Sequence, residues 1–224
     1  MGSIPTMHVE IWSDVVCPWC YIGKRRFERA VDQLSGEIDV EVVYRPYQLD
    51  PNAPPGAGTP VAEVYARKFG GPGQARAILD RVTAVAAGEG LEFRMDRAVR
   101  ANTRLAHRLL WYAEQPGSPV DQPAMKERLM RAYFHDGLDV GDPDVLADCA
   151  AEVGFDRDDV VAFLAGDAGV AEVMDHLAYA NDNSITAVPT YVLDGRWAVP
   201  GAQDTELFVN VLRRMAATSP AAGA

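Results

Sequence analysis

The sequence predicts an α/β fold that is interrupted by an all-helical segment. Three patterns support this prediction: a strand–helix–strand order near the start, a purely helical period from residue 61 to about residue 167, and a helix–strand–strand–helix order after it. We therefore expect an α/β domain formed by residues 7–58 and 170–218, and an inserted helical domain formed by residues 59–169.

The first unit is a strand, a helix and a second strand. Residues 8–12 are apolar and strand-like, and residues 17–34 have helical spacing that stops at Ser35-Gly36. Residues 38–44 alternate and are rich in β-branched side chains, which is typical of a strand. Two strands joined by a helix are expected to form a right-handed βαβ unit.

The helical segment begins after a loop at residues 52–60, which is rich in Pro, Gly and Ala. No strand pattern intrudes into it, so we expect an all-helical insertion. The predicted helices are residues 61–69, 74–87, 97–114, 122–134, 143–153 and 158–164.

The chain then returns to the α/β domain. Residues 169–181 are helical in pattern, and a strand at 190–193 is followed by Asp194-Gly195, a signal for a two-residue hairpin turn. Residues 197–199 are expected to pair back, and a last helix begins at Asp204 or Thr205.

Composition excludes several classes of function. The 32 acidic and 21 basic residues give a formal net charge of −11, which disfavours binding to nucleic acids or anionic membranes. No stretch is apolar enough to cross a bilayer, and residues 1–6 lack the features of a secretory signal, so we expect a cytoplasmic protein. Three cysteines do not form a disulfide framework; they are typical of a redox or metal site.

The chemistry is expected at Cys17-Pro18-Trp19-Cys20, where the first strand leads into the first helix. The unpaired N–H groups of a helix N-terminus stabilise a thiolate at Cys17, and Pro18 suits the first turn because its missing N–H costs nothing there. We expect Cys20 to be more buried and to resolve the mixed disulfide formed at Cys17. With this dithiol at the first strand–helix junction, the predicted order matches a thioredoxin-like fold with an inserted helical domain.

Several segments resemble one family. The stretch from Ser13 to Gly23, which contains the dithiol, is similar to the active-site segment of the DsbA-like thioredoxin superfamily, in particular its FrnE-like branch. This resemblance implies that Pro189 is cis, and that Pro18, Trp19, Val188 and Pro189 contact the substrate. Further similar segments are Arg45 to Leu49, Asn102-Thr103, residues 106–109 and 132–134, Asp142-Pro143, Val188-Pro189-Thr190 and Gly201-Ala202-Gln203.

Several of the candidate residues have other interpretations. A zinc site would need two more ligands, and Cys149 and the four scattered histidines form no paired motif, so no metal is expected. Asp14 is either a loop carboxylate at the helix start or a group that relays the proton of Cys20, and both interpretations stay open. Cys149 is expected to be a buried core residue.

Three further sets of residues have structural interpretations. Lys24, Arg25 and Arg26 are expected to form a solvated helix face, and His107 to pack or cap a helix. Trp197 either forms an exposed lip with Trp19 or packs as an ordinary strand residue.

The sequence thus predicts an enzyme, a protein disulfide oxidoreductase or isomerase, with Cys17 as nucleophile and Cys20 as resolving thiol. Its substrate would be a protein or small molecule that carries a thiol or disulfide, with no bound cofactor and glutathione or a similar thiol as a co-substrate. The alternatives are a glutathione-dependent enzyme resembling kappa-class transferases and hydroxychromene carboxylate isomerases, and a non-catalytic binding or chaperone-like module. The oligomeric state stays open, a homodimer included.

Overall fold

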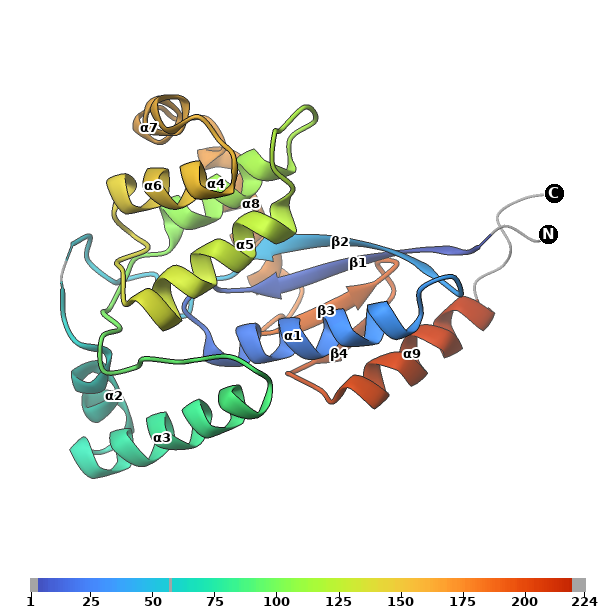
Figure 1. The fold of residues 1–224 in the computed structure, drawn as a ribbon, viewed down its shortest axis with the longest axis horizontal. Helices are drawn as coiled ribbons and strands as arrows, with labels where there is room; N and C mark the ends of the chain where they lie inside the picture. The colour runs from blue at the N-terminus through green and yellow to red at the C-terminus, as the bar shows by residue number, and fades with distance from the viewer. Residues whose placement is uncertain (1–3, 57, 219–224) are drawn as a thin grey trace.

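The computed structural model describes residues 4–56 and 58–218. Residues 1–3, which belong to the segment 1–6 considered above for a secretory signal, lie outside the described residues. Within residues 4–56 and 58–218, one four-stranded sheet organises the α/β part (Figure 1). Its order is β2-β1-β3-β4, in which β1 and β2 are parallel and the other neighbours are antiparallel. The strands are β1 (Thr6–Ser13), β2 (Asp39–Pro46), β3 (Thr190–Leu193) and β4 (Trp197–Pro200).

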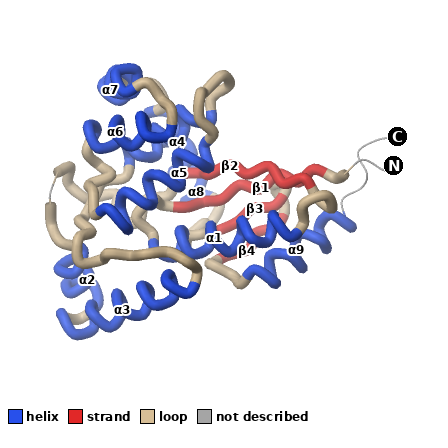
Figure 2. The backbone as a smooth tube through the Cα atoms, viewed as in Figure 1, coloured by secondary structure: helices blue, strands red, loops and turns tan. Residues whose placement is uncertain are grey.

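Two helices cover one face of this sheet (Figure 2). They are α1 (Pro18–Gln33) and α9 (Thr205–Thr218), which pack side by side. The ring of Phe27 on α1 lies 5.0 Å from that of Tyr191 on β3 and 5.1 Å from that of Phe208 on α9. On the other face, Tyr179 of α8 (Val170–Asp182) stacks on Trp12 of β1 at 5.5 Å.

The remaining helices gather at the end of the sheet where β1 ends and α1 begins (Figure 1). They form a second hydrophobic core, which the first turn of α1 enters with Cys17, Cys20, Tyr21 and Ile22. These helices are α2 (Val61–Phe69), α3 (Pro72–Gly88), α4 (Arg104–Glu114), α5 (Gln122–Arg131), α6 (Pro143–Val153) and α7 (Arg157–Ala165), with a π-helical turn over Ala132–Asp136.

The predicted thioredoxin-like α/β fold and the order of its elements are confirmed, with one clear error in the helical segment. Residues 97–103 were predicted as helix, but α4 begins only at Arg104. The preceding stretch is held to the start of α2 instead, because Ala98 accepts the backbone N–H of Val61 at 2.9 Å and Thr59 accepts that of Arg100 at 2.8 Å. The boundaries of the two domains stay a prediction. Within the described ranges, no helix is both long and apolar enough to span a membrane.

Candidate active site

Cys17 occupies the N-cap position of α1. Its backbone is extended, with φ of −87° and ψ of 115°, and Pro18 follows as the first helical residue. The Sγ of Cys17 accepts the backbone N–H of Cys20 at 3.4 Å, and its thiol donates to the carbonyl oxygen of Val188 at 3.8 Å. The sulfur therefore lies at the N-terminal end of the helix, against an N–H group that also donates to the backbone carbonyl of Cys17 at 3.1 Å.

Burial does not separate the two cysteines as the sequence suggested. Cys17 is 3% exposed and Cys20 is 2% exposed. The pKa of Cys20 is shifted, however: burial, the hydrogen bond with Cys17 and the charge of Cys17 raise the pKa of the Cys20 thiol well above its usual value. The positive charge of Lys126 and a backbone hydrogen bond with Asp14 oppose this rise in the pKa. Cys20 is thus held as a thiol at neutral pH.

The loop that contains Pro189 lies against the first turns of α1. The Val188–Pro189 peptide bond is cis, as the family resemblance implied. Gly23 permits this approach, since a Cβ placed there would lie 2.6 Å from the hydroxyl of Tyr191 and 3.1 Å from Cγ of Pro189. Within the dithiol motif, Trp19 is 40% exposed and so provides an apolar surface beside the cysteines.

Asp14 is fully buried just before the dithiol. Its Oδ2 accepts the backbone N–H of Leu49 at 2.8 Å, which ties the loop after β2 to the turn before Cys17. Its Oδ1 lies 3.3 Å from Nε2 of His107, but this nitrogen is only 2.9 Å from the carbonyl of Tyr47 and donates its proton there. Oδ1 is therefore left without a hydrogen bond. The proton-relay role of Asp14 stays a prediction.

The prediction that Lys24, Arg25 and Arg26 form a solvated face is wrong. Lys24 is only 3% exposed, and its Nζ pairs with Glu28 on α1 and, at 2.6 Å, with Glu127 on α5. Arg25 also reaches Glu127, at 2.7 Å. Arg26 donates to the carbonyl oxygen of Ala202 at 2.9 Å. These three cations fasten α1 to α5 and to the segment before α9.

Trp197 does not form a lip with Trp19. It pairs with Leu193 across the β3–β4 hairpin, and Leu193 in turn pairs with Val9 near the start of β1. Trp197 is therefore an exposed strand residue at the end of the sheet away from Cys17. Cys149 lies on α6, where it is 1% exposed within the helical core. In the part of the chain that the structure describes, no three His, Cys, Asp or Glu side chains come together as a metal site.

Lys126 on α5 is a residue that the sequence interpretation missed. Its side chain is completely buried, and its Nζ makes no hydrogen bond. It interacts electrostatically with Cys20, Asp14 and Cys17. A signal was present, because Lys126 precedes the buried Leu129, Met130 and Tyr133 by three, four and seven positions, so it lies on the apolar face of its helix.

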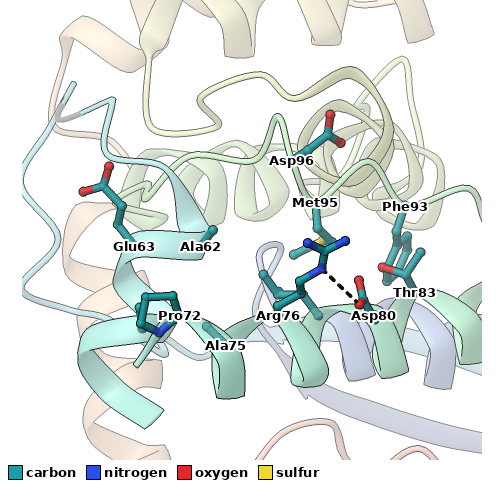
Figure 3. A pocket seen from close by; sticks show the side chains of 12 residues that line it. Ala62, Glu63, Pro72, Ala75, Arg76, Asp80, Thr83, Phe93, Met95 and Asp96 are labelled. Carbon is teal, nitrogen blue, oxygen red and sulfur yellow. Dashed lines mark ion pairs between the residues drawn. The ribbon is translucent and has the colours of Figure 1, made fainter. Parts of the chain in front are cut away.

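Two cavities lie near α2. One of about 290 Å³ is next to the dithiol, since Val16 and Tyr65 both line it. Burial, and to a smaller extent the charge of Cys17, raise the pKa of Tyr65. The cationic side chains of Lys68 and Arg100 also line it, although Arg100 is paired with Asp50 at 2.7 Å. A larger cavity of about 550 Å³ lies between α2, α3 and residues 93–96 (Figure 3).

A dithiol at the first strand–helix junction of such a sheet, faced by a cis proline, defines the class of thioredoxin-like proteins. The model of the DSBA-like thioredoxin domain matches residues 8–213 of this chain. The chain therefore belongs to the DsbA-like family, whose members act on thiols and disulfides.

The chain is similar to individual proteins along most of its length. A solved structure described as a probable DsbA oxidoreductase from Streptomyces coelicolor is 35% identical, with a TM-score of 0.86 over 97% of this chain and 93% of that one. The uncharacterized protein YwbO of Bacillus subtilis is 28% identical over 91% of this chain and 94% of its own length. The cytosolic disulfide reductase DsbM from Pseudomonas aeruginosa, solved with GSH, shares the fold at 19% identity and a TM-score of 0.60, over 93% of this chain and 98% of that one.

Proposed function

We propose that this protein is a thiol–disulfide oxidoreductase in which Cys17 exchanges with the substrate and Cys20 resolves the mixed disulfide. The observation that carries the proposal is the position of Cys17 at the N-cap of α1, where its Sγ accepts the backbone N–H of Cys20 at 3.4 Å. A helix N-terminus favours negative charge, so it stabilises the thiolate that must attack.

In the reducing direction, the Cys17 thiolate attacks one sulfur of the substrate disulfide. A Cys17–substrate bond forms, the substrate S–S bond breaks, and the first substrate thiolate leaves and takes up a proton. Cys20 then loses its thiol proton and attacks Sγ of Cys17, which expels the second substrate thiolate. Two electrons pass from the dithiol to the substrate, and the reverse sequence oxidises a dithiol substrate.

The substrate is proposed to be a protein or small molecule that carries a disulfide or thiol. It would lie against Pro18, the exposed face of Trp19, and Val188 and Pro189. The 290 Å³ cavity beside Val16 would hold the group next to the reacting sulfur. No bound cofactor takes part, and a small thiol such as glutathione would recycle the disulfide in a reducing cytoplasm.

The first test is the reduction potential of the Cys17–Cys20 pair, measured by thiol trapping after equilibration with glutathione at a series of ratios. We expect one reversible two-electron transition between about −270 and −120 mV, the span of known oxidoreductases. Its position also ranks the protein as a reductant or an oxidant. No transition in this window would contradict the proposal and favour a glutathione-dependent transferase or isomerase.

Single-cysteine variants test the two roles. In Cys20→Ser the mixed disulfide at Cys17 cannot be resolved, so it should accumulate with a disulfide substrate and be visible by mass spectrometry. In Cys17→Ser no adduct should form and turnover should fall to the uncatalysed level. Both variants are made in a Cys149→Ala background. Equal adduct formation in the two variants would reject the assignment of the nucleophile.

A further inference from the structure

Lys126 is a buried cation without a structural partner. It is 0% exposed, and no hydrogen bond satisfies its Nζ among the described residues. Lysine is almost never fully buried unless it is paired, since removal of an unpaired ammonium from water costs several kcal/mol. The Nζ lies 5.4 Å from the centre of the Tyr44 ring, a weak compensation for the lost hydration. Packing alone therefore gives no reason for a lysine at this position.

The groups that face Lys126 belong to the dithiol site. They are Cys20 on α1, Cys17 at its N-cap and Asp14 before it; outside that site, Lys24 on α1 interacts electrostatically with Lys126 and the Tyr44 ring on β2 lies beside it. Burial lowers the pKa of Lys126 to about 8, while negative charge on Cys20, Asp14 and Cys17 acts against this fall and Lys24 adds to it. Among the negative groups, Cys20 has the largest effect.

The interaction is reciprocal. The positive charge of Lys126 is the strongest influence that favours the thiolate of Cys20, and it exceeds that of the backbone hydrogen bond with Asp14. Every larger influence on Cys20, namely burial and the two interactions with Cys17, favours the protonated thiol. The charge of Lys126 therefore favours ionisation of the resolving thiol against the effect of its burial.

We propose that Lys126 stabilises the thiolate of Cys20 while this residue resolves the mixed disulfide. The inference rests on the proposed function. In that step the thiol proton of Cys20 passes to solvent, its sulfur bonds to Sγ of Cys17, and the bond from Cys17 to the substrate breaks. The electron pair departs on the substrate thiolate, which takes up a proton, and Lys126 stays an ammonium throughout. Lys126 acts through Cys20, so it is a positioning residue contributed by the helical segment.

A second buried lysine, in different surroundings, provides the control for stability. Lys24 is also buried, but it pairs with Glu28 and Glu127. Replacement of a paired buried charge leaves its partners uncompensated and destabilises the fold. Replacement of the unpartnered Lys126 by methionine removes a desolvated charge and leaves similar volume, so the fold should be as stable or more stable.

The experiment uses a coloured disulfide reagent in a Cys149→Ala background. Attack by Cys17 on a nitrobenzoate disulfide releases one coloured thiolate, and attack by Cys20 on the adduct releases a second. We expect Lys126→Met to slow the second phase about ten-fold or more near pH 7, which corresponds to at least one pKa unit at Cys20. The first phase should change less, and the rise of the second-phase rate with pH should move to higher pH. Lys24→Met should lower the melting temperature, whereas Lys126→Met should not.

The outcomes separate the two proposals. If the unmodified dithiol shows no second phase, the proposed function itself fails. If the second phase is present and Lys126→Met leaves its rate and pH profile unchanged, or slows both phases equally, the role of Lys126 is rejected. Lys126→Gln, which keeps a polar side chain but no charge, should behave as Lys126→Met does and serves if the methionine variant does not fold.

Discussion

The two halves of α1 are packed in different surroundings. The second half, with Phe27, Ala30 and Leu34, belongs to the core between the sheet and α9. The first turns, with Cys17 and Cys20, belong to the core of the helical segment. One helix thus joins two hydrophobic cores, and the dithiol lies in the second.

The two surroundings differ in polarity as well as in position. Around Phe27, aromatic rings pack on one another at about 5 Å. Around the first turns of α1, the neighbours include the buried charges of Asp14 and Lys126 and the partly buried Glu127. The sheet-side core therefore serves stability, whereas the surroundings of the dithiol combine packing with control of ionisation. Stability and reactivity should respond separately to changes on the two sides.

The largest effect is expected from Phe27→Ala. The side chain is 2% exposed and contacts two rings, so its loss should lower the free energy of unfolding by about 3–5 kcal/mol. Chemical denaturation measures this change. Because Phe27 lies on the sheet side, the rate of thiol exchange per folded molecule should remain that of the wild type.

The counterpart on the other side is Phe134→Ala. Phe134 is fully buried, stacks on Phe93 at 4.3 Å and lies 5.8 Å from the ring of Tyr21, which follows Cys20 directly. We expect a similar loss of stability together with slower exchange in the folded protein. If the two variants changed the exchange rate equally, the separation between the two cores would be wrong.

A smaller effect is expected from Glu127→Gln. Glu127 accepts hydrogen bonds from Tyr21 at 2.6 Å, from Lys24 at 2.6 Å and from Arg25 at 2.7 Å, and so holds α5 to α1. The side chain is 32% exposed, so water moderates the loss. We expect a decrease of about 1–3 kcal/mol in the free energy of unfolding, as for hydrogen bonds to charged groups.

The same carboxylate makes stability depend on pH. Burial alone would raise the pKa of Glu127, but Lys24, Tyr21 and Arg25 outweigh it and lower the pKa below its ordinary value. The contribution is then fully present above about pH 4.3, the pKa of an unfolded glutamate, and is lost as the pH falls through the lower folded value. Acid unfolding curves should show this loss in the wild type and a smaller one in Glu127→Gln. Identical curves would mean that the carboxylate does not hold the two helices together.

The elements were largely predictable from local pattern. The bounds of α2, α6 and β3 coincide with the predicted ones, because periodicity, a capping aspartate and a β-branched run are properties of neighbouring residues. The stretch 97–103 was not predictable in this way. Its backbone partners, Thr59 and Val61, lie far away in the chain. The spacing of apolar residues does not show that the backbone of this stretch forms hydrogen bonds with a distant segment instead of within a helix.

In the candidate site, too, the features set by neighbouring residues were predictable and those set by distant residues were not. The position of Cys17 at a helix start follows from Pro18 and the preceding strand, so the motif alone indicated it. The burial of Lys24 depends on its ion pair with Glu127, which is 103 positions later in the chain. Nothing in the sequence around Lys24 indicates that pairing. Charges that a local pattern assigns to solvent are buried here, because a helix from another part of the chain covers them.

The smallest effect is expected from Cys149→Ala, and it tests whether chemistry is confined to the first turns of α1. Burial raises the pKa of Cys149 to about 11, with Arg128 opposing and Glu152 adding to the rise. Near pH 7 only about one molecule in ten thousand then carries a thiolate there, so a thiol alkylating reagent should leave Cys149 unmodified in the folded protein.

Mass spectrometry of the alkylated protein distinguishes the sites. The folded protein should gain its label at Cys17, and the unfolded protein should gain three labels, one for each cysteine of the sequence. Cys149→Ala should keep wild-type turnover and lose about 1 kcal/mol of stability, the ordinary effect of one core substitution. Alkylation of Cys149 in the folded protein at the rate of Cys17 would show that the helical core is open enough to expose a third reactive thiol. Reactivity would then extend beyond the N-terminal turns of α1.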